Sequence, residues 1–180
     1  MKIRDFLFLY LFVFISATSE LTFQNNDNYH DYCVKSGGVI LNNTMGFGTR
    51  GGYVDGFSYD FCEIVKDGNL GMIGLETIGS TLPSLAATYI KNINIDRTKP
   101  ILGPYYQPAV NLCYSLGGSC LNYYHDGGFY DERGFSGICY FGDGSNIATW
   151  TLYYIGIGMR DDIKSLIRAD DLSINIPVIQ

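Results

Sequence analysis

The chain is poor in histidine, since only His30 and His125 occur among its 180 residues. A Cys–His catalytic pair needs a thiolate, a base and a group that orients the base. His30 precedes Cys33 by three residues, but we predict below that Cys33 forms a disulfide, and His125 falls in a polar loop that favours a solvated side chain. No serine stands in a G-x-S-x-G setting. We therefore predict a protein that is not an enzyme and name no catalytic residue; an uncharacterised secreted hydrolase is the alternative.

Basic residues are also scarce, with 12 Lys and Arg against 18 Asp and Glu and a formal net charge of −6. An acidic surface repels the phosphate backbone of nucleic acids and disfavours docking on anionic lipid. We expect no nucleic-acid partner and no membrane partner.

The spacing of metal ligands is missing too. Four acidic residues fall on predicted loops, where hard cations such as calcium find their ligands: Asp126, Asp131, Glu132 and Asp143. They do not match the D-x-D-x-D-G pattern of a calcium loop. The turn itself explains Asp143, since Asp tolerates a positive φ. We predict no metal and no cofactor.

The chain has a single long apolar run, at its N-terminus. Lys2 and Arg4 precede the apolar stretch Phe6–Ile15, and the small residues Ala17–Ser19 follow it, which is the pattern of a signal peptide. Ten apolar residues are too few to span roughly 30 Å of hydrocarbon. We predict that residues 1–19 are removed and that the protein is secreted. The mature chain then keeps 10 basic and 17 acidic residues, a net charge of −7.

Glycine and tyrosine are abundant, at 22 and 15 residues, and this suits turns and sheets more than long helices. The clearest local signal is a hairpin that turns at Asp143–Gly144 and returns over Ile147–Ile155, a strand that carries the only tryptophan, Trp150. A weaker hairpin upstream turns at Asp67–Gly68 and returns over Leu70–Ile78.

The two hairpins belong to longer stretches that match. Each stretch has a cysteine on a predicted helix, a double glycine that ends the helix, a second cysteine and an Asp-Gly pair. The first has Cys33, Gly37–Gly38, Cys62 and Asp67–Gly68, and the second has Cys113, Gly117–Gly118, Cys139 and Asp143–Gly144. We interpret the pattern as an internal repeat.

The second stretch resembles the domain-of-unknown-function 333 family, small secreted or lipoprotein modules of the hemolysin type. The residues that carry the resemblance are Gln107–Cys113, Gly117–Gly118, Gly137–Cys139, Asp143–Ser145 and Trp150. The match is strong over roughly 45 residues and weak over another 50, and the family's downstream cysteines are absent. The resemblance implies one helix on a three-stranded antiparallel sheet, similar in outline to the potato-inhibitor-like protease inhibitors.

We therefore predict an α+β protein of two small modules, each with a short helix packed on an antiparallel β-meander of about three strands. The expected segments are a signal peptide (1–19), a first diverged module (20–80), a connector (81–106), a second module (107–158) and a C-terminal tail (159–180).

Five cysteines in a secreted chain favour disulfides. Bonds from Cys33 to Cys62 and from Cys113 to Cys139 would each close a loop of about 25 to 30 residues and contribute roughly 3 kcal/mol. Buried free cysteines are the alternative. Cys120 is left over, and it is either packed in the core or available as a reactive or intermolecular thiol.

The predicted function is binding to a protein or glycan partner, in the manner of a protease inhibitor. The glycine-rich segments Met45–Phe57 and His125–Arg133 are the expected contact loops, and Asn42 begins a glycosylation sequon. The candidate contact aromatics are Tyr124, Tyr130, Trp150 and Tyr153. In a strand, Tyr153 and Tyr154 would point to opposite faces. The alternative is a hemolysin-like toxin that acts on membranes.

Overall fold

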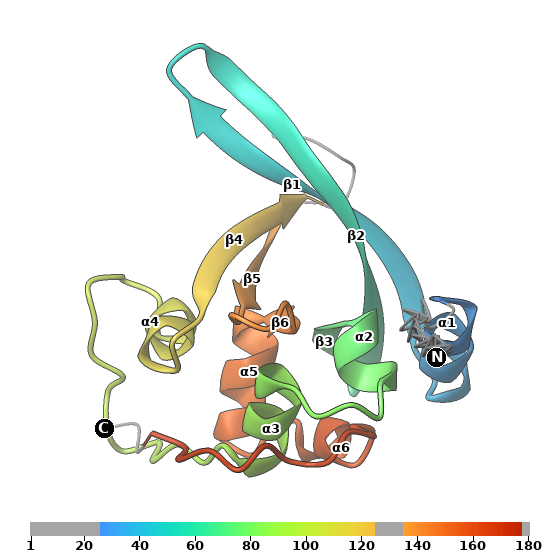
Figure 1. Cartoon of the computed structure of the whole chain (residues 1–180). Coiled ribbons are helices and arrows are strands. Elements are labelled where there is room, and N and C mark those ends of the chain that lie inside the picture. Colours follow the sequence, from blue (N-terminus) through green and yellow to red (C-terminus); the bar gives the residue numbers. More distant parts are fainter. Residues whose placement is uncertain (1–25, 125–134, 178–180) are drawn as a thin grey trace, which may run out of the picture.

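The computed structural model describes residues 26–124 and 135–177. In these stretches the chain forms six antiparallel strands that close into one barrel, with the strand order β1-β2-β3-β6-β5-β4, and six short helices. The strands are β1 (Val39–Thr49), β2 (Gly52–Lys66), β3 (Asn69–Gly74), β4 (Ser119–Tyr124), β5 (Phe135–Tyr140) and β6 (Asn146–Ala148). The helices are α1 (Asn26–Lys35), α2 (Leu75–Gly79), α3 (Leu85–Asn92), α4 (Pro108–Ser115), α5 (Thr149–Gly156) and α6 (Asp161–Lys164). Figure 1 shows the β1–β2 hairpin projecting at one end and the helices gathered toward the other.

The prediction of two separate helix-on-meander modules is wrong, because β1–β3 and β4–β6 form a single barrel. The two sets of strands join where Met45 of β1 pairs with Tyr123 of β4 and where Ile73 of β3 pairs with Ile147 of β6. A three-stranded sheet leaves unpaired backbone groups along both edges, and a unit of about 50 residues buries little core. Edge-to-edge pairing of the two sets of strands satisfies these backbone groups and also enlarges the buried core.

The return strands of both predicted hairpins are shorter than expected. β6 ends at Ala148 and continues directly into helix α5, where a strand was predicted to run to Ile155. In the same way β3 ends at Gly74 and helix α2 follows. The buried side chains of Leu152 and Ile155 lie one helical turn apart on α5. A short apolar run does not distinguish a strand from a buried helix, and packing against the barrel decides for the helix.

The predicted turns are confirmed. Asp67 and Gly68 have φ values of 52° and 76°, as a two-residue hairpin turn between β2 and β3 requires. Gly144 has a φ of 85° in the wider turn between β5 and β6.

The segment Met45–Phe57 was expected to be a loop, and that prediction is wrong as well. It forms the distal part of the β1–β2 hairpin, which turns at Arg50–Gly51 and has a register shift between Thr44 and Gly46. We call residues 46–58 the arm. Glycine depletion is usual in strands, and it is the cross-strand pairing of this segment that overrides its glycine content.

The hydrophobic interior has two parts because side chains alternate across each strand. A small cluster takes one residue from each of the six strands and therefore fills the barrel: Met45, Phe61, Met72, Tyr123, Ile138 and Ala148. The neighbouring residues, such as Cys62, Ile73 and Cys139, face outward into a larger core under the helices.

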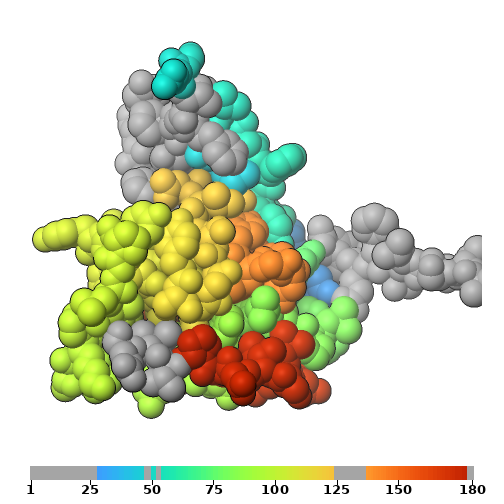
Figure 2. Space-filling view, turned by 60° about the vertical axis from the view of Figure 1, so that its left-hand side comes forward, coloured from blue at the N-terminus to red at the C-terminus, as the bar shows by residue number. Residues whose placement is uncertain are grey.

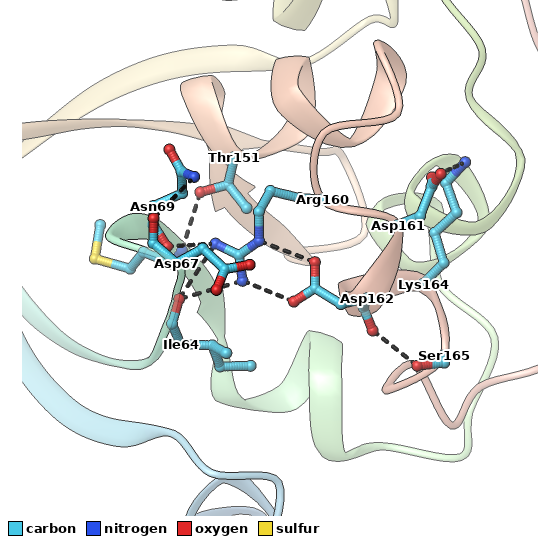
Figure 3. Close-up of polar contacts among 10 residues, drawn as sticks. Ile64, Asp67, Asn69, Thr151, Arg160, Asp161, Asp162, Lys164 and Ser165 are labelled. Carbon is cyan, nitrogen blue, oxygen red and sulfur yellow. Dashed lines mark hydrogen bonds and ion pairs between the residues drawn. The ribbon is translucent and has the colours of Figure 1, made fainter.

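Arg160 fixes the C-terminal segment to the barrel (Figure 3). The residue is 1% exposed, and its guanidinium forms a two-pronged ion pair with Asp162, at 3.0 Å for each N–O contact. It also donates to the carbonyl oxygens of Ile64 (3.3 Å) and Asn69 (2.8 Å), which flank the turn between β2 and β3. Gly71 leaves the space for this side chain, since a Cβ there would lie 2.9 Å from Nη1 of Arg160.

Candidate functional site

Of the aromatic side chains predicted as contacts, Trp150 and Tyr153 lie together on helix α5 rather than on a strand. Trp150 is 39% exposed, and its ring centroid lies 5.5 Å from that of Tyr153 and 5.7 Å from that of Tyr154. Residues three and four apart share one face of a helix. The segment is a helix, so the strand alternation expected for Tyr153 and Tyr154 does not apply; their ring centroids lie 6.0 Å apart, and the three rings form one cluster.

A groove of about 460 Å³ runs beside this cluster, and we call it the α5 groove. Its lining comes from β3, α4, β4, β5, β6 and α5: Gly68, Asn69, Leu70, Met72, Gln107, Val110, Cys120, Asn122, Gly137, Ala148, Thr149, Trp150, Thr151 and Tyr154. No acidic, basic or histidine side chain is among them. The groove thus combines aromatic rings with neutral polar groups and carries no charge.

Two amides of the groove are available to a ligand. Gln107, at the start of α4, makes no capping hydrogen bond, and neither its amide nor that of Asn122 has a hydrogen-bond partner in the described part of the chain. Both side chains are exposed. Thr151, by contrast, uses its hydroxyl to accept a hydrogen bond from the backbone N–H of Met72 at 2.9 Å. Sequence reasoning missed both amides, because they come together only in the folded barrel.

Both predicted disulfides are confirmed, Cys33–Cys62 and Cys113–Cys139. Cys120 carries a free thiol that lines the α5 groove. Partial burial raises the pKa of the Cys120 thiol above its ordinary value. The Cys120 side chain is thus partly packed and still reaches the groove.

A second concavity is an open basin of about 610 Å³, lined by residues of the segments 97–103 and 105–106, by Pro108 and Asn111, and by Tyr153 of α5. Asn111 shapes it, since its amide accepts from the N–H of Tyr105 at 3.0 Å and donates to the carbonyl of the same residue at 2.8 Å. Arg97 on its rim donates to the carbonyl of Ile157. In Figure 2 the yellow-green segment around residues 100–107 stands out from the surface, and Tyr106 on it is fully exposed.

Asp143 has a structural role. Its carboxylate accepts from the backbone N–H of Leu85 at 2.6 Å, and Ser145 accepts from that of Ala86 at 2.9 Å. Together with Ser84, they satisfy the N–H groups at the start of helix α3. In residues 26–124 and 135–177, no three acidic, histidine or cysteine side chains are grouped as a metal site would require.

His30 and Asn42 meet at the base of the arm. The Nε2 atom of His30 lies 3.2 Å from Oδ2 of Asp60, and the amide of Asn42 donates to Oδ1 of the same carboxylate at 2.6 Å. His30 therefore contacts a carboxylate on β2, while the nearby Cys33 is in a disulfide. Asn42 is exposed on β1, and its glycosylation stays a prediction.

Some predicted residues lie outside the described part of the chain. These are the signal peptide (1–19) and the whole contact loop His125–Arg133, with the candidate residues His125, Asp126, Tyr130, Asp131 and Glu132 in it. The backbone of Tyr124 ends β4, but its side chain is not described.

The barrel interior contains a polar cluster that sequence reasoning also missed. The hydroxyls of Tyr123 and Tyr140 lie 2.9 Å apart, and burial raises the pKa of the Tyr140 phenol. Nearby, Oδ1 of the buried Asn146 has no hydrogen-bond partner in the described residues, and a Cβ on Gly74 would lie 2.3 Å from it. The close packing at Gly74 leaves no room for a ligand there.

Comparison with known proteins gave no match to a protein-family model, a curated protein or a solved structure. Among the described residues, no helix has the length and apolar character needed to cross a membrane.

Proposed function

We propose that this chain is an extracellular, non-catalytic binding protein and that the α5 groove holds an uncharged glycan segment. The observation that carries the proposal is the composition of the groove, where the exposed indole of Trp150 lies beside the unpaired amides of Gln107 and Asn122 and no charged side chain is present.

Sugars fit such a surface for two physical reasons. A sugar ring has an apolar C–H face that can stack on an aromatic ring, and its hydroxyls both donate and accept hydrogen bonds. A side-chain amide offers both functions as well. An ionic ligand would lose its hydration in the groove and gain no opposite charge. The groove volume of about 460 Å³ lies within the usual range of ligand pockets.

The extracellular part of the proposal rests on two observations. The sequence begins with the pattern of a signal peptide. The structure contains two disulfides, which persist in oxidising compartments.

The test uses a panel of neutral oligosaccharides from cellulose, chitin, xylan and mannan. Trp150 is the only tryptophan in the chain, so its fluorescence reports on the groove directly. We expect at least one oligosaccharide to shift its emission and to bind in calorimetry. The variant Trp150→Ala should bind at least tenfold more weakly in calorimetry, because the stacking surface is gone.

The matched control is Tyr106→Ala, which removes a fully exposed aromatic ring outside the groove and should leave binding unchanged. Equal loss in the two variants, or no binding to any oligosaccharide of the panel, contradicts the proposal.

A second candidate function is protease inhibition through the arm. Phe57 is 80% exposed and Val54 is 52% exposed on a hairpin that projects from the barrel (Figure 1). Large exposed apolar side chains on an extended segment are suitable contacts for a protease cleft. We expect inhibition of at least one member of a panel of secreted proteases, lost in Phe57→Ala and retained in Trp150→Ala. A panel with no inhibited protease rejects this function.

A further inference from the structure

The free thiol of Cys120 lies directly across the strand pair from one end of a disulfide. In the register of β4 and β5, Cys120 pairs with Cys139, and Cys139 is bonded to Cys113 on α4. Directly opposed residues of antiparallel strands point to the same face and have Cα atoms about 4.5 to 5.5 Å apart. That separation lies within the range of about 4.4 to 6.8 Å that a disulfide spans. Three cysteines therefore converge at one place.

We infer that Cys120 is a thiol–disulfide exchange site. The Cys120 thiol loses its proton to solvent, and the thiolate attacks the Sγ atom of Cys139. A bond forms between Cys120 and Cys139, the bond between Cys139 and Cys113 breaks, and Cys113 leaves as a thiolate that takes up a proton. One disulfide and one thiol are present before and after, so the step needs no external oxidant or reductant.

The contacts around Cys120 place its thiol beside the strand that carries Cys139. Its Sγ atom lies over Gly137, at 3.3 Å from where a Cβ on that residue would be. Gly137 is two residues before Cys139 on the same strand, so rotation about the Cα–Cβ bond of Cys120 turns the thiol toward Cys139. The absence of a side chain at Gly137 leaves room for the rotation.

The groups that face Cys120 are nearly all uncharged. The groove lining contributed by β3, β5 and α5 holds no acid, base or histidine. On α4, the titratable neighbour is Tyr114, whose phenol pKa is itself raised, chiefly by a hydrogen bond with Tyr105. Among the described residues that line the groove, no cation is therefore placed to stabilise the thiolate, and burial raises the pKa of Cys120. Exchange should be slow near neutral pH and faster at alkaline pH.

Exchange would alter the α5 groove, and this consequence rests on the proposed function. Cys113 forms the disulfide link between helix α4 and strand β5 of the barrel. Val110 on that helix and Gln107 at its N-terminal end line one wall of the groove. Release of Cys113 removes the disulfide that holds this wall against the barrel. The pairing of the three cysteines therefore controls how firmly the groove holds its ligand.

The first half of the chain supplies the control, because Ile40 takes the position of Cys120. Ile40 pairs with Cys62 across β1 and β2, and Cys62 is bonded to Cys33 on α1. The same arrangement of strand, helix and disulfide is thus present without the attacking thiol.

The experiment maps which cysteines react with N-ethylmaleimide in the native protein at pH 7, 8 and 9. The labelled chain is digested in acid without reduction and examined by mass spectrometry. We expect label on Cys120 and also on Cys113, with the rate of Cys113 labelling rising about tenfold per pH unit while Cys120 is mainly protonated. The labelled fraction should not change on tenfold dilution, because the step is intramolecular.

Two variants make the result decisive. Cys120→Ser should leave every cysteine unlabelled, and label on Cys113 in this variant would show that its disulfide opens by another route. Ile40→Cys places a thiol opposite Cys62 and should add label on Cys33. Failure to do so would show that strand register is insufficient and would overturn the mechanism.

Label confined to Cys120 at every pH rejects the exchange. The readout contains no sugar, so this failure leaves the glycan proposal standing, and a failed oligosaccharide panel leaves the labelling result unaffected.

Discussion

The two corners where a helix meets the first strand of each half have nearly the same geometry. At each corner a glycine with a φ close to 80°, Gly37 or Gly117, ends the helix. The N–H of the next glycine, Gly38 or Gly118, donates to the carbonyl oxygen of the helical cysteine at 2.9 Å in both cases. The disulfides have Cα–Cα distances of 5.7 and 5.6 Å. An internal repeat would account for this agreement, and it stays a prediction from the sequence.

The halves differ in what they add to the shared corner. The first extends β1 and β2 into the arm and has Ile40 opposite its disulfide. The second places Cys120 opposite its disulfide and adds the eight-residue helix α5 with Trp150. The corner is thus a structural unit that both halves need, and the α5 groove belongs mainly to the second half.

The largest expected effect concerns Arg160, which holds the hairpin turn between β2 and β3 through the carbonyls of Ile64 and Asn69. Arg160→Met should lower the free energy of unfolding by about 3 kcal/mol, because Asp162 and the carbonyls of Ile64 and Asn69 lose a buried partner. Urea unfolding measures the change. A loss under 1 kcal/mol would show that the contacts of Arg160 are dispensable for stability.

The same ion pair predicts a dependence on pH. The hydrogen bond and charge of Arg160 hold the pKa of Asp162 below its ordinary value. A carboxyl group whose pKa is lower in the folded state stabilises the fold above its unfolded pKa, and that contribution is lost as the pH falls through the folded pKa. Unfolding of the wild type between pH 5 and 2 should therefore show a steeper loss of stability than unfolding of Arg160→Met.

Removal of each disulfide tests whether the corners are energetically equal. The bonds join residues 29 and 26 positions apart, so the chain-entropy model gives nearly the same stabilisation, about 3 kcal/mol for each. We expect equal losses in urea unfolding for Cys33→Ala with Cys62→Ala and for Cys113→Ala with Cys139→Ala. A difference above 1 kcal/mol between the two losses would show that one corner depends more on its disulfide than the other.

The second glycine of each corner should tolerate substitution by alanine less well than the first. A Cβ on Gly38 would lie 2.5 Å from Sγ of Cys62, and a Cβ on Gly118 would lie 2.5 Å from Sγ of Cys139. We expect alanine at either position to cost about 2 kcal/mol, since the disulfide must move. Gly117→Ala is the control, with open space around the Cβ and a cost of about 1 kcal/mol for its positive φ. Equal thermal shifts for Gly118→Ala and Gly117→Ala would contradict the packing argument.

The smallest effect separates the two Asp-Gly turns. Asp143→Asn should cost about 1 kcal/mol, because an amide nitrogen cannot accept from the N–H of Leu85. Asp67→Asn should be nearly neutral, since Asn also adopts the positive φ of that turn. Thermal unfolding of the two variants side by side checks this ranking, which equal shifts would refute.

Local signals in the sequence were sufficient for part of the fold. The disulfide partners, the double glycines and the turn at Asp67–Gly68 were predicted correctly, because a positive φ or a helix end is encoded within a few residues. The return strand from Ile147 was not, because its apolar residues suit a strand and a buried helix equally well. For the site, Trp150 was identified as a candidate, while Gln107 was missed because nothing local marks it.

By itself, the sequence determined the two corners, since each depends on glycine φ values and on cysteines that lie within one supersecondary unit. Only the tertiary structure decided that the halves share one barrel, that Trp150 lies on a helix, and that Cys120 and Gln107 line the same groove. The physical reason is that the free strand edges and half-covered cores of the two halves are satisfied by each other. Such long-range pairing leaves no signal within a short window of sequence.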